Sequence, residues 1–212
     1  MRFKEIELFI EILLNHQPKR VLEFGSGFST LYYPDFLAED AEWISVEHDR
    51  DWYENINDRV NSKEKVTIYQ IDPEVNEWIY NGDYSDFRTY VDFPLDHGKF
   101  DLILVDGMAR ESCIDKSLKL LNPNGLLIVH DGNIKAYQPH IKNYPKWLIF
   151  EDYRKTVGGF GFGSIELDLK NVFDIQKHAK IWSIDSKIHN FFKFKFLLGK
   201  KAKSFGYFLS TD

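Results

Sequence analysis

Two acidic residues and two glycines in the first quarter of the chain have the spacing of a nucleoside-binding site. Glu23 is followed by Gly25 and Gly27, and Glu47 lies about twenty residues beyond this glycine pair. Glycines in such a turn let a ligand approach the backbone closely and permit a positive φ. A carboxylate at the position of Glu47 can accept hydrogen bonds from both hydroxyls of a ribose. The pattern therefore predicts that the protein binds a nucleoside.

Two positions in the same motif indicate the charge of that nucleoside. Folds that bind dinucleotides have a third glycine where this chain has Thr30, which disfavours a pyrophosphate. Glu23 would repel a diphosphate and attract a cation. S-adenosylmethionine carries a sulfonium and an ammonium group, so it suits these residues. The alternative is an NAD-dependent oxidoreductase, which Glu47 permits and which Thr30 and Glu23 disfavour.

A second group of polar residues could carry out proton transfer. Asp106 follows one apolar run, and His130 and Asp131 follow another. Because imidazole titrates near neutral pH, we predict that His130 or Asp131 accepts a proton from a hydroxyl or amine nucleophile. Asp106 or Asp131 could instead orient that base or hold a divalent metal. The structural alternative is that His130 hydrogen-bonds a loop and Asp131 caps a turn.

Arg110 lies four residues after Asp106 and is a candidate for substrate binding. Its guanidinium could form paired hydrogen bonds with a substrate carboxylate. Pairing with an acid on a helix surface is the alternative.

The polar residues follow strands that alternate with helices. Strands are expected at residues 20–24, 43–47, 66–71, 100–105 and 126–129. Helices are expected at residues 4–14 and 49–61. Two further helices are expected after the first and fourth strands, ending at about residue 37 and at residue 121. This alternation predicts an α/β fold with a parallel sheet covered on both faces. The carboxyl ends of such strands meet at one edge, where ligands bind.

The glycine-rich segment 158–163 has phenylalanines between its glycines. We expect it to form a hairpin turn between closing strands at residues 147–153 and 164–169. A flexible lid over the substrate is the alternative.

Glu23-x-Gly25-x-Gly27, together with Glu47 and Asp106, resembles the class I S-adenosylmethionine-dependent methyltransferases over about residues 1–170. The resemblance includes the turn Asn122-Pro123-Asn124-Gly125. It implies a single-domain, Rossmann-like fold with a mostly parallel, seven-stranded sheet.

The same resemblance assigns roles within the cofactor site. It implies that the first acid and the two glycines of the motif hold the methionine portion, with the hydroxyl of Ser29 or Thr30 nearby. Glu47 would bind the ribose. His48 and Asp72 resemble positions in the adenine pocket of these enzymes.

Residues 105–110 and 129–131 also resemble small O-methyltransferases, some of which hold a divalent metal. In that subgroup an Asn directly follows the second acid, whereas this chain has Asp131-Gly132-Asn133. The expected reaction is O-methylation of a small-molecule or sugar-like acceptor, with metal use left open. A third hypothesis is a non-catalytic adenosyl-binding module that kept the fold and lost the chemistry.

Composition and charge exclude several other classes. The 212 residues include 27 basic and 33 acidic side chains, a net charge of −6 that disfavours nucleic acids. No uncharged stretch approaches the roughly 18 to 20 apolar residues that would cross a bilayer. Cys113 is the single cysteine, and the first residues are too charged for a secretory signal, so we expect a cytoplasmic protein.

The last part of the chain has a different composition. We expect residues 1–170 to form the cofactor-binding domain and residues 171–212 to form a docked, helical extension. Within it, residues 187–203 contain lysines among phenylalanines and leucines, without an acid. Such a segment could contact an anionic membrane, or it could be a terminal helix whose lysines face water.

Overall fold

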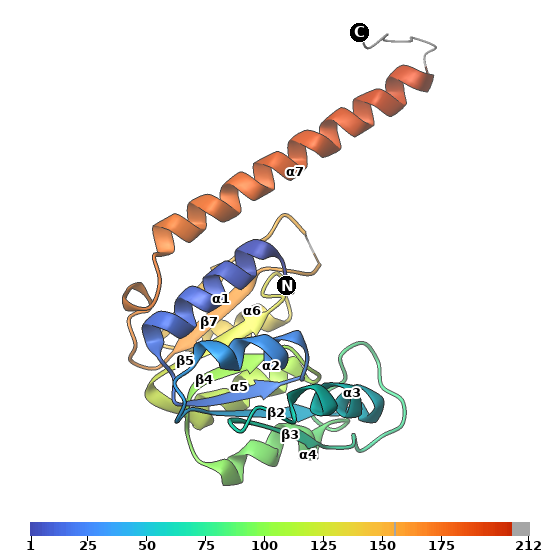
Figure 1. Cartoon of the computed structure of the whole chain (residues 1–212). Coiled ribbons are helices and arrows are strands. Elements are labelled where there is room, and N and C mark those ends of the chain that lie inside the picture. The colour runs from blue at the N-terminus through green and yellow to red at the C-terminus, as the bar shows by residue number, and fades with distance from the viewer. Residues whose placement is uncertain (155, 205–212) are drawn as a thin grey trace.

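The computed structural model describes residues 1–154 and 156–204, which form a single domain around one seven-stranded sheet (Figure 1). The strands are β1 (Arg20–Phe24), β2 (Glu42–Glu47), β3 (Val66–Gln70), β4 (Phe100–Val105), β5 (Leu121–His130), β6 (Lys146–Phe150) and β7 (Phe160–Ser164). Their order in the sheet is β3-β2-β1-β4-β5-β7-β6, and β7 runs antiparallel to both of its neighbours. The predicted Rossmann-like α/β fold with a mostly parallel sheet is therefore confirmed.

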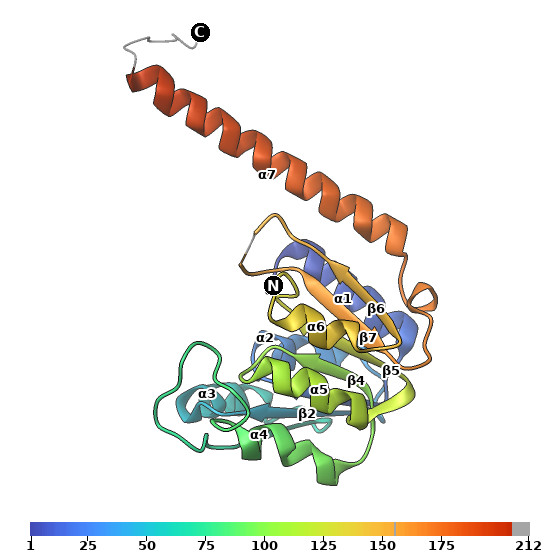
Figure 2. The same ribbon diagram turned by 180° about the vertical axis from the view of Figure 1, so that it is seen from behind.

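Helices cover both faces of the sheet. One face carries α1 (Phe3–His16), α2 (Phe28–Tyr32) and α3 (Arg50–Val60) (Figure 1). The opposite face carries α4 (Arg88–Asp92), α5 (Arg110–Leu120) and α6 (Tyr137–Lys142) (Figure 2). Short 3-10 helices lie at η1 (Tyr33–Phe36), η2 (Phe93–His97) and η3 (Leu169–Asn171). This two-sided cover explains the continuous apolar runs of the central strands.

Helix α1 buries part of the apolar face that its sequence predicts. The helical spacing predicts a face with Ile6, Phe9, Ile10, Leu13 and Leu14, of which Phe9 and Leu13 are buried. Leu8 and Ile12 complete the buried stripe, and Ile6 is exposed at the end of the helix that lies near the site.

Strand register brings the carboxyl ends of β1, β2 and β4 together. Phe24 at the end of β1 lies opposite Val46 of β2 and Val105 of β4. The residues that follow these three strands therefore share one edge of the sheet, as predicted for the ligand site.

The predicted closing pair of strands is present as β6 and β7, which pair antiparallel, but its bounds differ from the prediction. Gly158 and Gly159 lie in the connection between the two strands, whereas residues 160–163 belong to β7 itself and form neither a turn nor a lid. Phe160 and Phe162 are fully buried on one face of the sheet. Gly163 faces the opposite way, where a Cβ would lie 2.6 Å from Cγ of Tyr144. The strand ends at Ser164 instead of beginning there. Alternating Phe and Gly thus reflect a strand that packs closely against Ile141 of α6 and against Tyr144 just after that helix.

The Asn-Pro-Asn-Gly segment also differs from its expected role as a turn between a helix and a strand. It lies within β5, where Phe100 pairs with Leu121 but Leu102 pairs with Leu126. The extra residues form an irregularity in β5, consistent with the turn preference of their types.

The last helix, α7 (Ile175–Ser204), begins on the globular body and continues beyond it (Figures 1 and 2). Trp182 is buried and its ring stacks on Phe150 at a centroid distance of 5.6 Å. The side chains of residues 191–204 and all of residues 205–212 lie outside the described part, so the predicted basic, aromatic surface at 187–203 stays a prediction.

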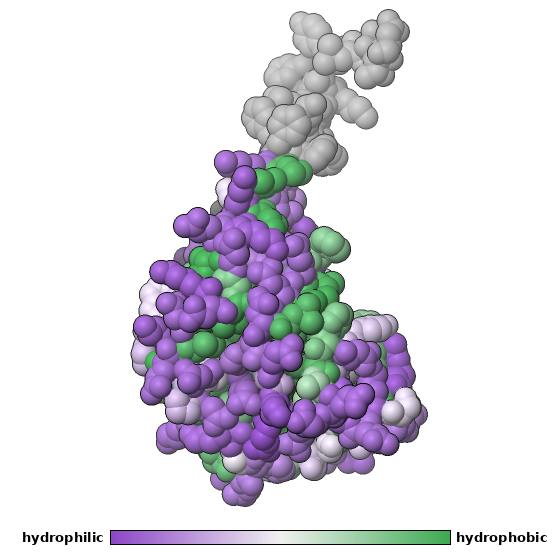
Figure 3. All heavy atoms as spheres, turned by 60° about the vertical axis from the view of Figure 1, so that its left-hand side comes forward, coloured by the Kyte–Doolittle hydropathy of each residue, from purple (hydrophilic) through white to green (hydrophobic). Residues whose placement is uncertain are grey.

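The surface shown in Figure 3 is mostly hydrophilic, with apolar side chains gathered mainly in the part of the body nearest to α7. Among the helices that the structure describes, none combines the length and the apolar character needed to cross a lipid bilayer.

Candidate functional site

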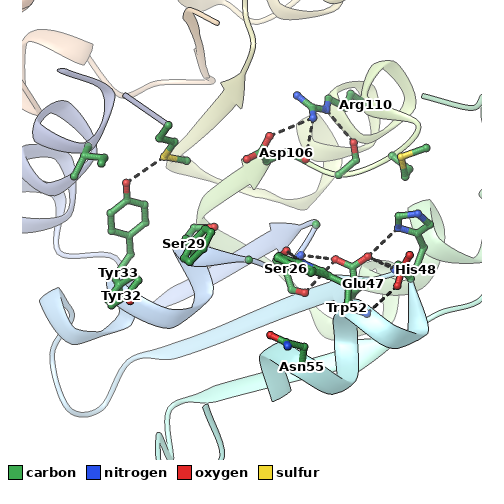
Figure 4. A pocket seen from close by; sticks show the side chains of 18 of the residues that line it. Ser26, Ser29, Tyr32, Tyr33, Glu47, His48, Trp52, Asn55, Asp106 and Arg110 are labelled. Carbon is green, nitrogen blue, oxygen red and sulfur yellow. Dashed lines mark hydrogen bonds and ion pairs between the residues drawn. The ribbon is translucent and has the colours of Figure 1, made fainter. Parts of the chain in front are cut away.

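A cavity of about 1230 Å³ opens at the edge where β1, β2 and β4 end (Figure 4). Its walls come from α1, from the turn after β1 with α2, η1 and α3, and from the turn after β4. It is lined by seven residues of the predicted site: Gly25, Gly27, Ser29, Glu47, His48, Asp106 and Arg110. The other predicted residues do not line it: Glu23, Thr30, Asp72, His130 and Asp131.

The two positions in the turn after β1 are glycines for different structural reasons. Gly25 has a φ of +93°, and a Cβ there would lie 2.5 Å from Cα of Gly107 and 2.7 Å from its nitrogen. A Cβ at Gly27 would meet nothing within 4 Å. Position 25 therefore has no side chain because the turn after β4 packs against it, and Gly27 is the position that leaves room for a ligand. The close packing of Gly107 against Gly25 was not predicted, although Gly107 follows Asp106 directly.

Glu47 ends β2 with its carboxylate fixed on both sides. Oε2 accepts hydrogen bonds from the backbone nitrogen of Ser26 at 2.9 Å and from its hydroxyl at 3.1 Å. Oε1 accepts from the backbone nitrogens of His48 at 2.9 Å and Asp49 at 3.0 Å. Figure 4 shows Ser26, Glu47 and His48 together on one side of the cavity. Four hydrogen bonds from the chain therefore fix the position and orientation of this buried carboxylate at the cavity wall.

Helix α3 contributes three lining residues that were not predicted as part of the site. They are Asp51, Trp52 and Asn55. The indole nitrogen of Trp52 donates to the carbonyl of Ser26 at 2.7 Å, which ties α3 to the turn after β1. The helical spacing of Trp52, Ile56 and Val60 predicts that they share one face of the helix, but Ile56 is buried and Trp52 is 41% exposed.

Glu23 lies below the cavity and does not face it. Its Oε2 accepts hydrogen bonds from Oγ1 of Thr30 at 2.6 Å and from the indole of Trp43 at 3.0 Å. The hydroxyl of Ser29 also donates to this carboxylate. Burial raises the pKa of Glu23 to about 7. The predicted direct contact with a cationic ligand is therefore replaced by a positioning role, because Glu23 holds Ser29, which does line the cavity.

Glu23 should make the stability of the protein depend on pH. Its pKa is about 7 in the folded state against an ordinary value of 4.5, so the folded protein retains a proton that the unfolded chain releases. We expect the contribution of Glu23 to the free energy of unfolding to fall by about 3 kcal/mol as the pH rises from below 4.5 to above 7.

Glu23→Gln should remove most of this pH dependence. The glutamine oxygen can accept from Thr30 and Trp43, while its amide donates to Ser29. Urea unfolding at several pH values would measure the change, with Glu42→Gln at the exposed start of β2 as the control. An unchanged pH dependence in Glu23→Gln would contradict the assignment.

Arg110 joins the two acids of the predicted catalytic group. Its Nη2 lies 3.2 Å from Oδ1 of Asp106, and its Nη1 lies 3.3 Å from Oδ2 of Asp131. The guanidinium also donates to the backbone carbonyls of Asp106, Gly107 and His130. These contacts engage the donors that the expected substrate carboxylate would need, so Arg110 positions the acids instead.

His130 lies behind Asp106 and outside the cavity. Its Nδ1 is 2.9 Å from Oδ1 of Asp106, and its Nε2 is 3.6 Å from Oε2 of Glu5. Burial alone would lower the pKa of His130, but hydrogen bonds with these two carboxylates raise it to about 9. The charged imidazolium is therefore favoured at neutral pH, and this form cannot accept the proton that the sequence assigned to it. Glu5 was missed because it lies in α1, far away in sequence.

Asp131 is also turned away from the cavity. Its φ is +61°, and its Oδ1 accepts a hydrogen bond from the backbone nitrogen of Gly158. Left-handed backbone is tolerated by Asp in turns. This geometry matches the structural alternative, in which Asp131 stabilises a turn.

The donors near Asp106 do not fit a divalent metal in this arrangement. Asp106, His130 and Asp131 offer ligand atoms within 4.8 Å of one another. However, Arg110 pairs with both carboxylates, and His130 favours its charged form. Asn133, two residues after the second acid, donates to the loop after β6. The cationic side chains of Arg110 and His130 thus already neutralise the carboxylates that a metal ion would need as ligands.

The predicted adenine-pocket residues have different positions. Asp72 is exposed and lies 3.3 Å from Nη2 of Arg50. His48 lines the cavity, and its ring lies edge-on to Trp78 and Phe87 at centroid distances of 5.6 Å and 5.5 Å. The segment that carries these two aromatic residues had no clear pattern in the sequence.

The chain shares its architecture with solved methyltransferases at low identity. The O-methyltransferase TomG from Streptomyces achromogenes, in complex with SAM, is 17% identical, with a TM-score of 0.56 over 76% of this chain and 79% of that one. The O-methyltransferase from Bacillus cereus, in complex with SAH, is 14% identical, with a TM-score of 0.59 over 76% and 80%. The protein has a methyltransferase fold.

The methyltransferase fold extends to a different activity as well. Spermidine synthase from Thermotoga maritima is 17% identical, with a TM-score of 0.53 over 81% of this chain and 61% of that one. No model of a protein family matches the sequence, and no curated protein matches it either. Within a methyltransferase fold, the chemistry must therefore be argued from the cavity.

Proposed function

We propose that the protein is an S-adenosylmethionine-dependent methyltransferase that methylates an oxygen of a small-molecule acceptor. The observation that carries this proposal is Glu47, whose carboxylate is held by backbone donors at the cavity wall beside Gly27. A carboxylate at this place suits the two hydroxyls of a ribose. Solved structures with the same fold, in complex with SAM or SAH, support the choice of nucleoside.

The acidic lining of the cavity also supports a cationic cofactor. S-adenosylmethionine supplies a methyl group on a positively charged sulfur. Asp49, Asp51 and Asp106 join Glu47 in the walls. Since the sulfonium charge disappears in the displacement, the residues of the chain need to orient the reactants and exclude water more than to stabilise a new charge.

Asp106 is the residue best placed to accept the acceptor's proton. It lines the cavity, and its side chain remains 26% exposed. His130 and Arg110 hold the carboxylate from behind at 2.9 Å and 3.2 Å. In the transfer, the acceptor oxygen bonds to the methyl carbon, the carbon–sulfur bond breaks, and the hydroxyl proton passes to Asp106. His130 and Arg110 then act as positioning residues.

Glu47→Gln tests the cofactor assignment. We expect about thirtyfold weaker binding of S-adenosylhomocysteine, because the amide nitrogen would face backbone donors on one side of the original carboxylate. Titration calorimetry measures the change. Glu42→Gln, at the other end of the same strand, should bind within about twofold of the wild type.

The alternatives give different results in the same experiment. Tight binding of NAD without binding of S-adenosylhomocysteine would overturn the proposal in favour of an oxidoreductase. Binding of S-adenosylhomocysteine without methyl transfer to any acceptor would favour the non-catalytic module.

A further inference from the structure

One wall of the cavity is formed by large apolar side chains. Ile6 belongs to α1, Phe28 and Tyr32 to α2, and Phe36 to η1. Their exposed fractions range from 37% for Ile6 and Phe36 to 64% for Phe28. The rings of Phe28 and Tyr32 stack at a centroid distance of 6.4 Å. Large apolar residues gathered at an accessible wall are typical of a ligand-binding surface.

This apolar wall lies opposite the polar end that holds Glu47. In Figure 4, Tyr32 and Tyr33 lie at one side of the cavity and Glu47 and His48 at the other, with Ser29 between them. The volume of about 1230 Å³ exceeds the usual range of roughly 300–1,000 Å³ for the pocket of one small ligand. The cavity therefore has room for a nucleoside at its polar end and for a second molecule along the apolar wall.

The charges of the cavity select against an anionic second molecule. Five lining residues carry carboxylates: Asp35, Glu47, Asp49, Asp51 and Asp106. Among the lining residues, which all belong to the described part of the chain, Arg110 is the one Lys or Arg side chain. It already lies between two carboxylates, so it offsets little of the repulsion between the acidic lining and an anionic ligand.

A sugar-like acceptor also fits this wall poorly. Among the four residues of this wall, Tyr32 is the one with a hydrogen-bonding group, so most hydroxyls of a sugar would lie against Ile6, Phe28 and Phe36 without a partner. Removing those hydroxyls from water without partners would cost free energy. An apolar body instead gains from the same contacts.

We propose that the methyl acceptor is an uncharged molecule with an elongated apolar body and a hydroxyl group. The apolar body lies along Ile6, Phe28, Tyr32 and Phe36, and the hydroxyl reaches Asp106. This inference rests on the proposed function, because it places the acceptor in the cavity that Glu47 shares.

Three matched probes test the chemistry of the acceptor. Para-hexylphenol has an apolar chain, phenol lacks it, and hydroxyphenylhexanoate carries a carboxylate at the end of the same chain. Calorimetry with protein saturated with S-adenosylhomocysteine should give para-hexylphenol at least about tenfold tighter binding than either other probe. Burial of two methylene groups is enough for a gain of this size.

Substitutions in the wall locate the binding site. Ile6→Gln and Phe28→Ser should each weaken binding of para-hexylphenol by at least about fivefold and change phenol binding by less than about twofold. Both side chains are partly exposed, so the variants should fold, which thermal unfolding would check. Ile79→Gln is the matched control, because Ile79 is 91% exposed and does not line the cavity.

The outcomes separate this inference from the proposed function. If S-adenosylhomocysteine binds but para-hexylphenol binds no better than phenol or the carboxylate probe, the inference is overturned and the proposed function stands. Loss of binding in Ile79→Gln equal to that in Ile6→Gln would also overturn it. If S-adenosylhomocysteine does not bind but para-hexylphenol binds the protein alone with the expected preference over the other probes, the proposed function is overturned and the apolar binding wall is supported.

Discussion

Asp106→Asn should lower the rate of methyl transfer to para-hexylphenol by at least about 100-fold, while the affinity for S-adenosylhomocysteine stays within about threefold. Asn has the same shape as Asp but cannot take up the hydroxyl proton. Its oxygen can still accept the hydrogen bond from His130, so the fold around the site should persist. Transfer from radiolabelled S-adenosylmethionine measures the rate, and calorimetry measures the affinity.

Asp131→Asn is the matched control for this prediction. It removes one negative charge from the same cluster, and Asn tolerates the φ of +61° found there. Because Asp131 does not line the cavity, we expect less than about a tenfold loss of rate. A larger loss in Asp131→Asn than in Asp106→Asn would move the role of proton acceptor to Asp131, as the sequence also allowed.

Gly25→Ala should be the most damaging of these substitutions for stability. The new Cβ would lie 2.5 Å from Cα of Gly107, and the backbone would keep a φ of +93° that alanine disfavours. We expect a loss of about 4 kcal/mol, which lowers the melting temperature by about 12 °C for a chain of this size. Calorimetric or spectroscopic melting curves measure it.

Gly27→Ala separates folding from binding in the same turn. Its Cβ would meet no atom within 4 Å, so the melting temperature should change by less than about 3 °C. The methyl group would enter space that a ligand needs, and binding of S-adenosylhomocysteine should weaken by about tenfold. Equal melting temperatures for the two alanine variants would contradict the distinction between the two glycines.

The central part of the fold could be predicted because its strands are buried on both faces. β1 and β4 are short, mostly apolar segments, and both have the expected boundaries. β7 could not be predicted in the same way, since glycine usually weakens a strand. Its glycines are explained by Ile141 of α6 and by Tyr144 just after that helix, whose proximity appears only in three dimensions.

The candidate site shows a similar division. Glu47 could be predicted because its position depends on local spacing along two adjacent strands. The environment of His130 could not, because its charge depends on Glu5 in α1. Likewise, the burial of Glu23 depends on hydroxyl and indole donors from α2 and β2 that close over it.

The alternation of Phe and Gly in β7 also fixes its register with the neighbouring strands. Sliding β7 by one residue would turn Phe160 and Phe162 toward α6 and leave holes under α1. The pairing of Phe160 with His130 is thereby fixed, and with it the point where β5 stops. β7 contributes no residue to the cavity, but its alignment thus determines, to within one residue, the position of His130, which supports Asp106 from behind.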